Sequence, residues 1–132
     1  MGLRRVVQAN DAPAAIGPYS HAIVVEPFVY TAGQGGLDPA TGSLVPGGIE
    51  AQTRQTLLNL ETILKAAGSS LANVIKTTVF LANIDDFPVM NRIYAQFFPD
   101  QPPARTTVQA AKLPLGALVE IEAVALIDKH AK

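Results

Sequence analysis

The segment Pro102–Val108, which reads Pro-Pro-Ala-Arg-Thr-Thr-Val, constrains the chain more than any other. The two prolines fix their own φ and disfavour helix at the preceding residue, so the chain must enter the segment extended. The β-branched residues that follow favour a strand. Arg105 therefore begins a strand, on backbone with little freedom. Its rigid fork of donors matches a carboxylate bidentately, although pairing with a nearby surface acid is the alternative.

Two amphipathic helices are predicted upstream of this strand. Apolar residues recur at helical spacing over 50–67, and a glycine that suits a helix end follows. A second apolar stripe runs over 87–97, with Pro88 in its first turn and Asp85 or Asp86 as the capping residue.

Short runs of β-forming residues predict strands around these helices. We place them at 3–8, 23–25, 28–32, 74–81, 105–110 and 118–127. Alternation puts Ile75, Thr77, Val79 and Leu81 on one face of their strand, and Val119, Ile121, Ala123, Ala125 and Ile127 on one face of the last. The order predicts an α+β fold in one domain, 1–132, in which two helices pack on one face of a mixed β-sheet.

The other face of this sheet needs a partner. It carries apolar side chains such as Phe80, Val124 and Leu126, and two helices can cover only one face. Charged residues make up only 16% of the chain, against about 25% in a typical soluble domain. We therefore expect the bare face to be buried in a closed ring of identical subunits.

Composition also excludes several classes of function. A net charge of −1 gives no electrostatic footprint for nucleic acid. The absence of cysteine excludes disulfides and thiolate nucleophiles, and His21 and His130 are too few to indicate a metal site. Apolar runs are too short for a membrane span, and the N-terminus lacks the apolar core of a signal peptide. We expect a soluble, cytoplasmic protein.

Two carboxylates on the last predicted strand are the candidates for acid–base chemistry. Glu120 and Glu122 share a face and lie about 6.6 Å apart along the strand. Each is either a solvated or ion-paired acid or, among apolar neighbours, a group that orients a water or passes a proton. If Arg105 lies near one of them, it keeps that acid ionised.

Three further side chains have open interpretations. Tyr19 follows a rigid Gly-Pro pair and either lines a pocket or anchors a loop to the core. Thr107 shares a face with Arg105 and can bond a ligand, although a sheet-facing threonine needs no such role. For Asn91, spacing alone favours simple solvent exposure.

Taken together, seven segments resemble the RidA/YjgF family of enamine/imine deaminases. The resemblance covers nearly the whole chain and rests on the order of all seven rather than on any one. The segments are 17–20 (Gly-Pro-Tyr-Ser), 32–34 (Ala-Gly-Gln), 50–55, 76–81, 90–91, 103–106 and 119–123.

The resemblance implies a chorismate-mutase-like fold and a homotrimer whose sheets face a central barrel and whose clefts lie between subunits. It implies hydrolysis of 2-aminoacrylate and related 2-imino acids to 2-keto acids and ammonia, without metal or cofactor. It assigns Arg105 to the substrate carboxylate and Glu120 to water positioning or proton transfer. It gives substrate-binding roles to Tyr19, Gly33 and Asn91. We add Thr107 as a candidate substrate-binding residue because of its position beside Arg105.

Two positions depart from the pattern of that family. Ala32 stands where Ser is frequent, and Thr107 stands where Cys is frequent. Both changes alter pocket polarity and leave substrate preference open. A regulatory trimer that binds a small carboxylate such as a 2-keto acid without turnover is therefore the alternative. A ribonuclease or translation inhibitor is disfavoured, because the chain has neither a basic patch nor a well-placed histidine pair.

Overall fold

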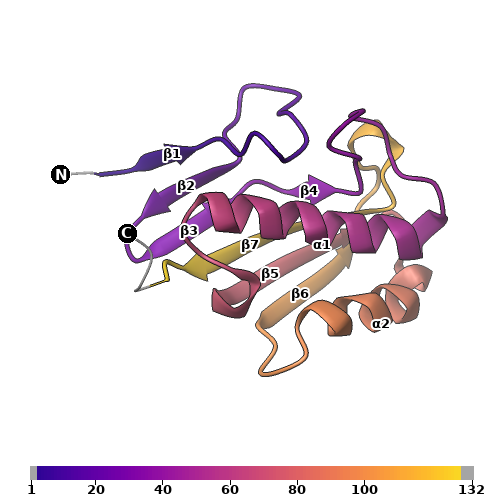
Figure 1. Ribbon diagram of the computed structural model, residues 1–132. Coiled ribbons are helices and arrows are strands. Elements are labelled where there is room, and N and C mark those ends of the chain that lie inside the picture. The colour runs from indigo at the N-terminus through magenta and orange to yellow at the C-terminus, as the bar shows by residue number, and fades with distance from the viewer. Residues whose placement is uncertain (1–2, 129–132) are drawn as a thin grey trace.

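Within the described residues, seven strands form one sheet. Figure 1 shows α1 (Gly48–Ala66) and α2 (Phe87–Phe97) on the same face of this sheet. This computed structural model describes residues 3–128. The predicted α+β fold, a mixed sheet with two helices on one face, is confirmed. The elements are β1 (Arg5–Val7), β2 (Ala22–Val25), β3 (Phe28–Thr31), β4 (Gln34–Gly35), α1 (Gly48–Ala66), β5 (Val74–Leu81), α2 (Phe87–Phe97), β6 (Ala104–Gln109) and β7 (Val119–Leu126).

The strand order puts the arginine strand at an edge of the sheet. The order is β1-β2-β3-β7-β5-β6, and the short β4 also pairs with β7. Only β5 and β6 are parallel; the other pairs are antiparallel. Parallel neighbours need a crossover, and α2 supplies it between β5 and β6. Consequently α2 lies over the edge strand that carries Arg105.

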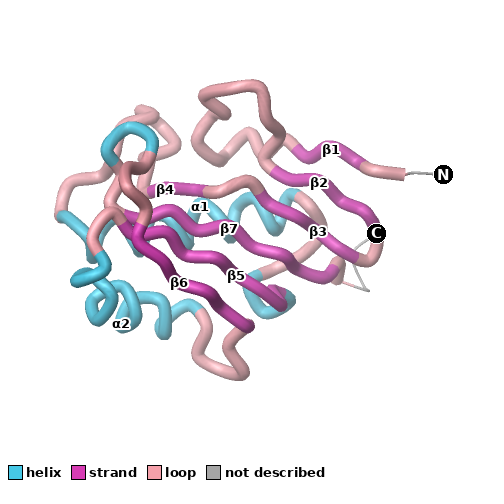
Figure 2. The backbone as a smooth tube through the Cα atoms, turned by 180° about the vertical axis from the view of Figure 1, so that it is seen from behind, coloured by secondary structure: helices cyan, strands magenta, loops and turns pink. Residues whose placement is uncertain are grey.

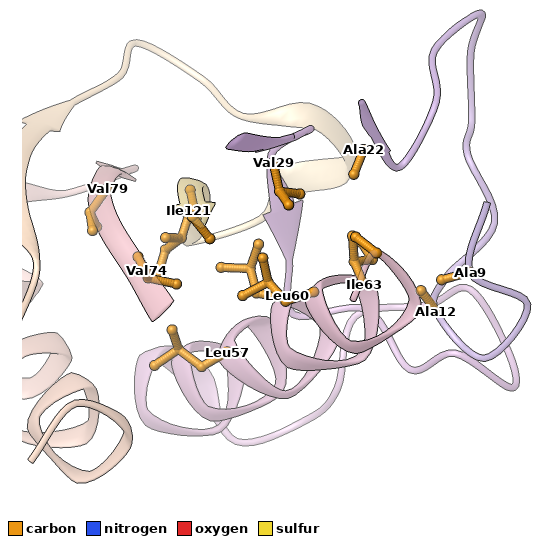
Figure 3. Packing of buried hydrophobic residues seen from close by; sticks show 14 of the residues in the cluster. Ala9, Ala12, Ala22, Val29, Leu57, Leu60, Ile63, Val74, Val79 and Ile121 are labelled. Atoms are coloured by element: carbon orange, nitrogen blue, oxygen red, sulfur yellow. The ribbon is translucent and has the colours of Figure 1, made fainter. Parts of the chain in front are cut away.

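The core lies between α1 and the sheet. Leu57, Leu60 and Ile63 are at most 1% exposed, as the predicted helical stripe requires. Figure 3 shows Leu60 and Ile63 facing Val29 and Ile121 of the sheet. Full burial of each such side chain contributes about 1.5–3 kcal/mol, which fixes the sheet against α1 and defines its covered face.

The alternation of buried and exposed residues was predicted well for β7 and less well for β5. In β7, Ile121 and Ala123 are buried while Glu122 is exposed, as expected. In β5 the prediction for Ile75 is wrong: it is 41% exposed, and Val74 is buried instead. A register irregularity between Val74 and Lys76 causes the difference, because one extra residue reverses the alternation before it.

Two other local predictions need correction. Asp86 occupies the N-cap position of α2 as predicted, but its side chain makes no capping hydrogen bond. Asn83 instead accepts a hydrogen bond from the Asp85 amide at 2.9 Å in a 3₁₀ turn before the helix. The two-residue β4 was not predicted, and the first strand is shorter than expected. Pro88 does occupy the first turn of α2.

The face of the sheet away from the helices is open and apolar. Figure 2 shows this face from behind, with the helices on the far side. Large side chains on it are at least 36% exposed: Val6, Val25, Phe28, Tyr30, Val108 and Leu126. An apolar surface of this kind marks an interaction site. Its burial in an oligomer remains a prediction. Within residues 3–128, no helix is long and apolar enough to cross a membrane.

Candidate functional site

The sheet separates the predicted site residues into two groups. Arg105 is the cross-strand neighbour of Thr77, and Thr107 that of Val79, so both lie on the face that the helices cover. Glu120 is the neighbour of Phe80 and lies on the open face. Within one chain, therefore, the Arg105 guanidinium and the Glu120 carboxylate do not come into contact. The hypothesis that Arg105 keeps Glu120 of the same chain ionised is wrong.

We call the first group, Arg105, Thr107, Asn91, Phe87 and Tyr94, the arginine half-site. The Cζ atom of Arg105 lies 4.8 Å from the ring centroid of Tyr94 and 5.4 Å from that of Phe87. Along the described chain, Arg105 forms no ion pair with a carboxylate. The alternative of a guanidinium paired with a nearby acid is thus not what the structure shows, and the charge is available to a ligand.

Two polar atoms of the arginine half-site are buried without a partner. They are Oδ1 of Asn91 and Oγ1 of Thr107. Asn91 follows Phe87 by four residues and precedes Tyr94 by three, so it shares the helix face that meets Arg105. The interpretation of Asn91 as simply solvent-exposed is wrong for this oxygen, because α2 packs that face on β6. Buried polar atoms are normally hydrogen-bonded, so these two are candidate ligand contacts.

We call the second group the glutamate pocket. It is a cavity of about 280 Å³ that Glu120, Gly33 and Tyr19 line together with apolar residues. The apolar part of the wall is formed by Pro13, Ala14, Ile16, Leu37, Pro114 and Leu115. A cavity that combines apolar walls with a few polar groups is typical of small-molecule sites.

Gly33 leaves room for the carboxylate of Glu120. A Cβ atom at position 33 would lie 2.9 Å from Cδ and 3.0 Å from Cγ of Glu120, and would overlap Oε2. The carboxylate therefore rests against the backbone of Gly33. Burial raises the pKa of Glu120 above its ordinary value, and the negative charge of Glu122 raises it further. Such a carboxylate is more basic than an exposed one.

A buried histidine anchors the loop that carries Tyr19. The amide of Ala9 donates to Nδ1 of His21 at 2.9 Å, so Nε2 carries the proton and donates to the Pro13 carbonyl at 2.8 Å. The Tyr19 hydroxyl accepts from the Ile16 amide at 3.2 Å, while the side chain is 43% exposed. Tyr19 thus both braces its loop and lines the pocket.

No group of three or more potential metal ligands occurs within residues 3–128, and His130 lies outside the described residues. The half-site residues that the sequence missed are Phe87 and Tyr94. Both belong to the apolar stripe predicted over 87–97, to which the sequence analysis gave no binding role. Their spacing of seven residues, with Asn91 between them, was the available signal.

Comparisons with known proteins agree with the predicted resemblance. Residues 9–127 match the family described as Endoribonuclease L-PSP. The chain is 51% identical over 124 residues to a goat protein (Capra hircus) named 2-iminobutanoate/2-iminopropanoate deaminase, covering 94% of this chain and 90% of that one.

Solved structures are similar over the same extent. The crystal structure of a putative endoribonuclease L-PSP from Entamoeba histolytica has a TM-score of 0.91 and 47% identity, and the match covers 95% of this chain and 100% of that one. That of E. coli TdcF with bound serine has a TM-score of 0.89 and 38% identity, covering 94% and 99%.

Proposed function

Because the chain belongs to the Endoribonuclease L-PSP family, which comprises the RidA/YjgF proteins, we propose that it hydrolyses reactive enamines and imines. Its substrates are 2-aminoacrylate and 2-imino acids, and its products are 2-keto acids and ammonia. The identity to a named 2-iminobutanoate/2-iminopropanoate deaminase over nearly the whole chain carries this proposal. The free charge of Arg105 and the basic carboxylate of Glu120 support it.

The active site forms between copies of this chain. Because Arg105 and Glu120 lie on opposite faces of one sheet, a complete site needs the arginine half-site of one protomer beside the glutamate pocket of its neighbour. The open apolar face supplies the surface for such contacts. The assembly is a homotrimer, as in the resemblance, and each of its clefts holds one small carboxylate substrate.

In this cleft Arg105 binds the substrate carboxylate through charge-assisted hydrogen bonds. 2-Aminoacrylate reacts as its imine tautomer, in which one proton has moved from nitrogen to the CH2 carbon. The C=N carbon of an imine is already electrophilic, so no covalent intermediate with the protein is needed. Glu120 orients one water and accepts its proton as oxygen bonds to that carbon. This proton moves to nitrogen and gives a carbon that bears one hydroxyl and one amino group. The hydroxyl proton then also passes to nitrogen as the C=O bond forms, so the C–N bond breaks and ammonia leaves. Positioning supplies most of the acceleration.

Thr107 and Asn91 place further polar contacts beside the bound carboxylate. Their unpartnered oxygens can bond the imine N–H or a water in the cleft. Thr107 supplies a hydroxyl and no thiol, so the reaction proceeds without a sulfur nucleophile. Ala32, which lines the glutamate pocket, adds no polar side-chain group there.

The test is hydrolysis of an imine generated in situ by an amino-acid oxidase, followed as release of keto acid and ammonia. Wild-type protein should accelerate release beyond the spontaneous rate. Arg105→Ala should lose nearly all acceleration while keeping the same oligomeric state by light scattering. Arg105→Lys is the matched control, since it keeps the charge but not the bidentate fork. Full activity in Arg105→Ala would contradict the carboxylate assignment.

A binding protein without turnover is the second candidate. E. coli TdcF, which is similar to this chain, was solved with bound serine, an amino acid that carries a carboxylate, and this supports the second candidate. Calorimetry with a 2-keto acid, run beside the activity assay, separates the two functions. Wild-type protein that binds the 2-keto acid without hydrolysing imines favours the binding protein.

A ribonuclease, which the family description names, has less support. His21 is only 4% exposed and uses both ring nitrogens within the protein, so it cannot serve RNA cleavage. RNA cleavage that survives further purification and that Glu120→Gln abolishes would reverse this assignment.

A further inference from the structure

We infer that Tyr94 is a positioning residue for this reaction: with Phe87 it forms an aromatic seat that holds the Arg105 guanidinium in place for an anionic ligand. The inference rests on the proposed function, since it concerns how the same arginine is presented to the substrate. It assigns a role in substrate binding to a residue that the apolar pattern of α2 places in the core.

The first observation is the placement of the guanidinium. The Cζ atom of Arg105 lies 4.8 Å from the Tyr94 ring centroid and 5.4 Å from that of Phe87. Both distances fall within the range in which a cation is attracted to an aromatic face. A guanidinium held in this way keeps its N–H donors at its edge, where a carboxylate binds bidentately.

The second observation is that the Tyr94 ring is itself fixed. Its hydroxyl and Oγ1 of Thr77 lie 2.7 Å apart and form a hydrogen bond, and both residues are at most 5% exposed. Thr77 is the cross-strand neighbour of Arg105. The same pair of strands therefore holds the arginine and the group that anchors its aromatic support.

The third observation concerns charge. Burial raises the pKa of Tyr94, and this outweighs the opposing effects of the Thr77 hydrogen bond and of the Arg105 charge. Tyr94 is therefore a neutral phenol at physiological pH. It attracts the guanidinium through its ring without neutralising it, whereas a carboxylate in this place would compete with the substrate.

The chain offers a matched control in Phe98. Its ring packs against Tyr94 with centroids 4.7 Å apart, and it is 6% exposed, but no cation–π contact joins it to Arg105. A leucine at either position removes a buried ring and costs packing energy. Only the leucine at position 94 removes a ring from beneath the guanidinium.

The experiment compares Tyr94→Phe, Tyr94→Leu and Phe98→Leu. Arg105 is expected to bind the substrate carboxylate equally in the ground state and the transition state. Loss of its aromatic support should therefore raise KM and leave kcat nearly unchanged. Loss of one desolvated cation–π contact predicts a rise of about tenfold in KM for Tyr94→Leu, with kcat within about twofold. Tyr94→Phe should restore KM to within about threefold of wild type. Phe98→Leu should lower the melting temperature and leave KM unchanged.

A second readout does not depend on turnover. In ¹⁵N-arginine-labelled protein, the Nε–H proton of Arg105, identified by its loss in Arg105→Ala, should show an aromatic ring-current shift. Tyr94→Phe should keep this shift and Tyr94→Leu should reduce it. If wild-type protein shows the ring-current shift but neither binds a 2-keto acid nor hydrolyses imines, the result contradicts the proposed function and leaves the placement of Arg105 on Tyr94 intact. An unchanged KM in correctly assembled Tyr94→Leu, or an equal rise in Phe98→Leu, overturns the inference.

Discussion

Gly33→Ala should lower the rate of imine hydrolysis while the protein still folds. The new Cβ would lie 2.9 Å from Cδ of Glu120 and closer still to its carboxylate oxygen, whereas 3.4 Å is the start of ordinary contact. The carboxylate must therefore move by about 1 Å, and an error of that size in a catalytic group costs about 10²-fold in rate. We expect kcat to fall about 100-fold, measured as keto-acid release from an imine generated in situ.

Folding should survive this change, because Gly33 does not have the positive φ that disfavours alanine and the displaced group is the end of a flexible side chain. Gly35→Ala is the control: its Cβ would make only ordinary contacts, 3.5 Å from the Val119 carbonyl and 3.6 Å from Ala117. In Glu120→Gln, adding Gly33→Ala should cost little more, since both changes act on one group. Gly33→Ala retaining more than a third of wild-type kcat would refute this reasoning.

Three further outcomes are expected. Activity should fall in acid as Glu120 is protonated, and Glu122→Gln should move this fall in kcat/KM to lower pH, because burial alone then raises the pKa of Glu120. Glu120→Gln should raise the melting temperature at pH 7–8, because the raised pKa of Glu120 means that its ionised form destabilises the folded state. The gain in melting temperature should shrink as the pH falls through the pKa of folded Glu120 and vanish below 4.5, the ordinary value. Leu115→Gly should stabilise the protein by about 0.5–1 kcal/mol in urea unfolding. Leu115 has a φ of 61°, and an unchanged midpoint would show that its side-chain contacts offset the backbone strain.

The sequence predicted those parts of the fold in which local chemistry decides the structure. The β-branched residues after Pro103 form β6 as predicted, and the apolar stripe over 50–67 predicted α1 nearly to its observed ends. The expected extended entry is wrong at Gln101, which precedes Pro102 and has a φ of 47°. The bulge at Val74–Lys76 and the two-residue β4 lie beyond such reasoning, because pairing with β7 determines both.

The site was predicted as a set of residues but not as an arrangement. Alternation correctly put Glu120 and Glu122 on one face and Arg105 and Thr107 on one face. Whether Arg105 of β6 lies on the same face of the sheet as Glu120 of β7 depends on how α2 packs across the edge strand. That packing is a tertiary contact, and it also turns Asn91 inward. The roles of these residues in substrate binding remain proposals.

The placement of Arg105 and Glu120 on opposite sides of one sheet has a genetic consequence. In the proposed site between subunits, a chain lacking the guanidinium and a chain lacking the carboxylate should each be inactive alone, yet mixing them lets intact halves come from different polypeptides. With random exchange of subunits around a ring, about one junction in four pairs both intact halves. Two alleles that are inactive alone can therefore complement each other in one cell. A single defective allele can also inactivate sites that wild-type subunits would otherwise complete.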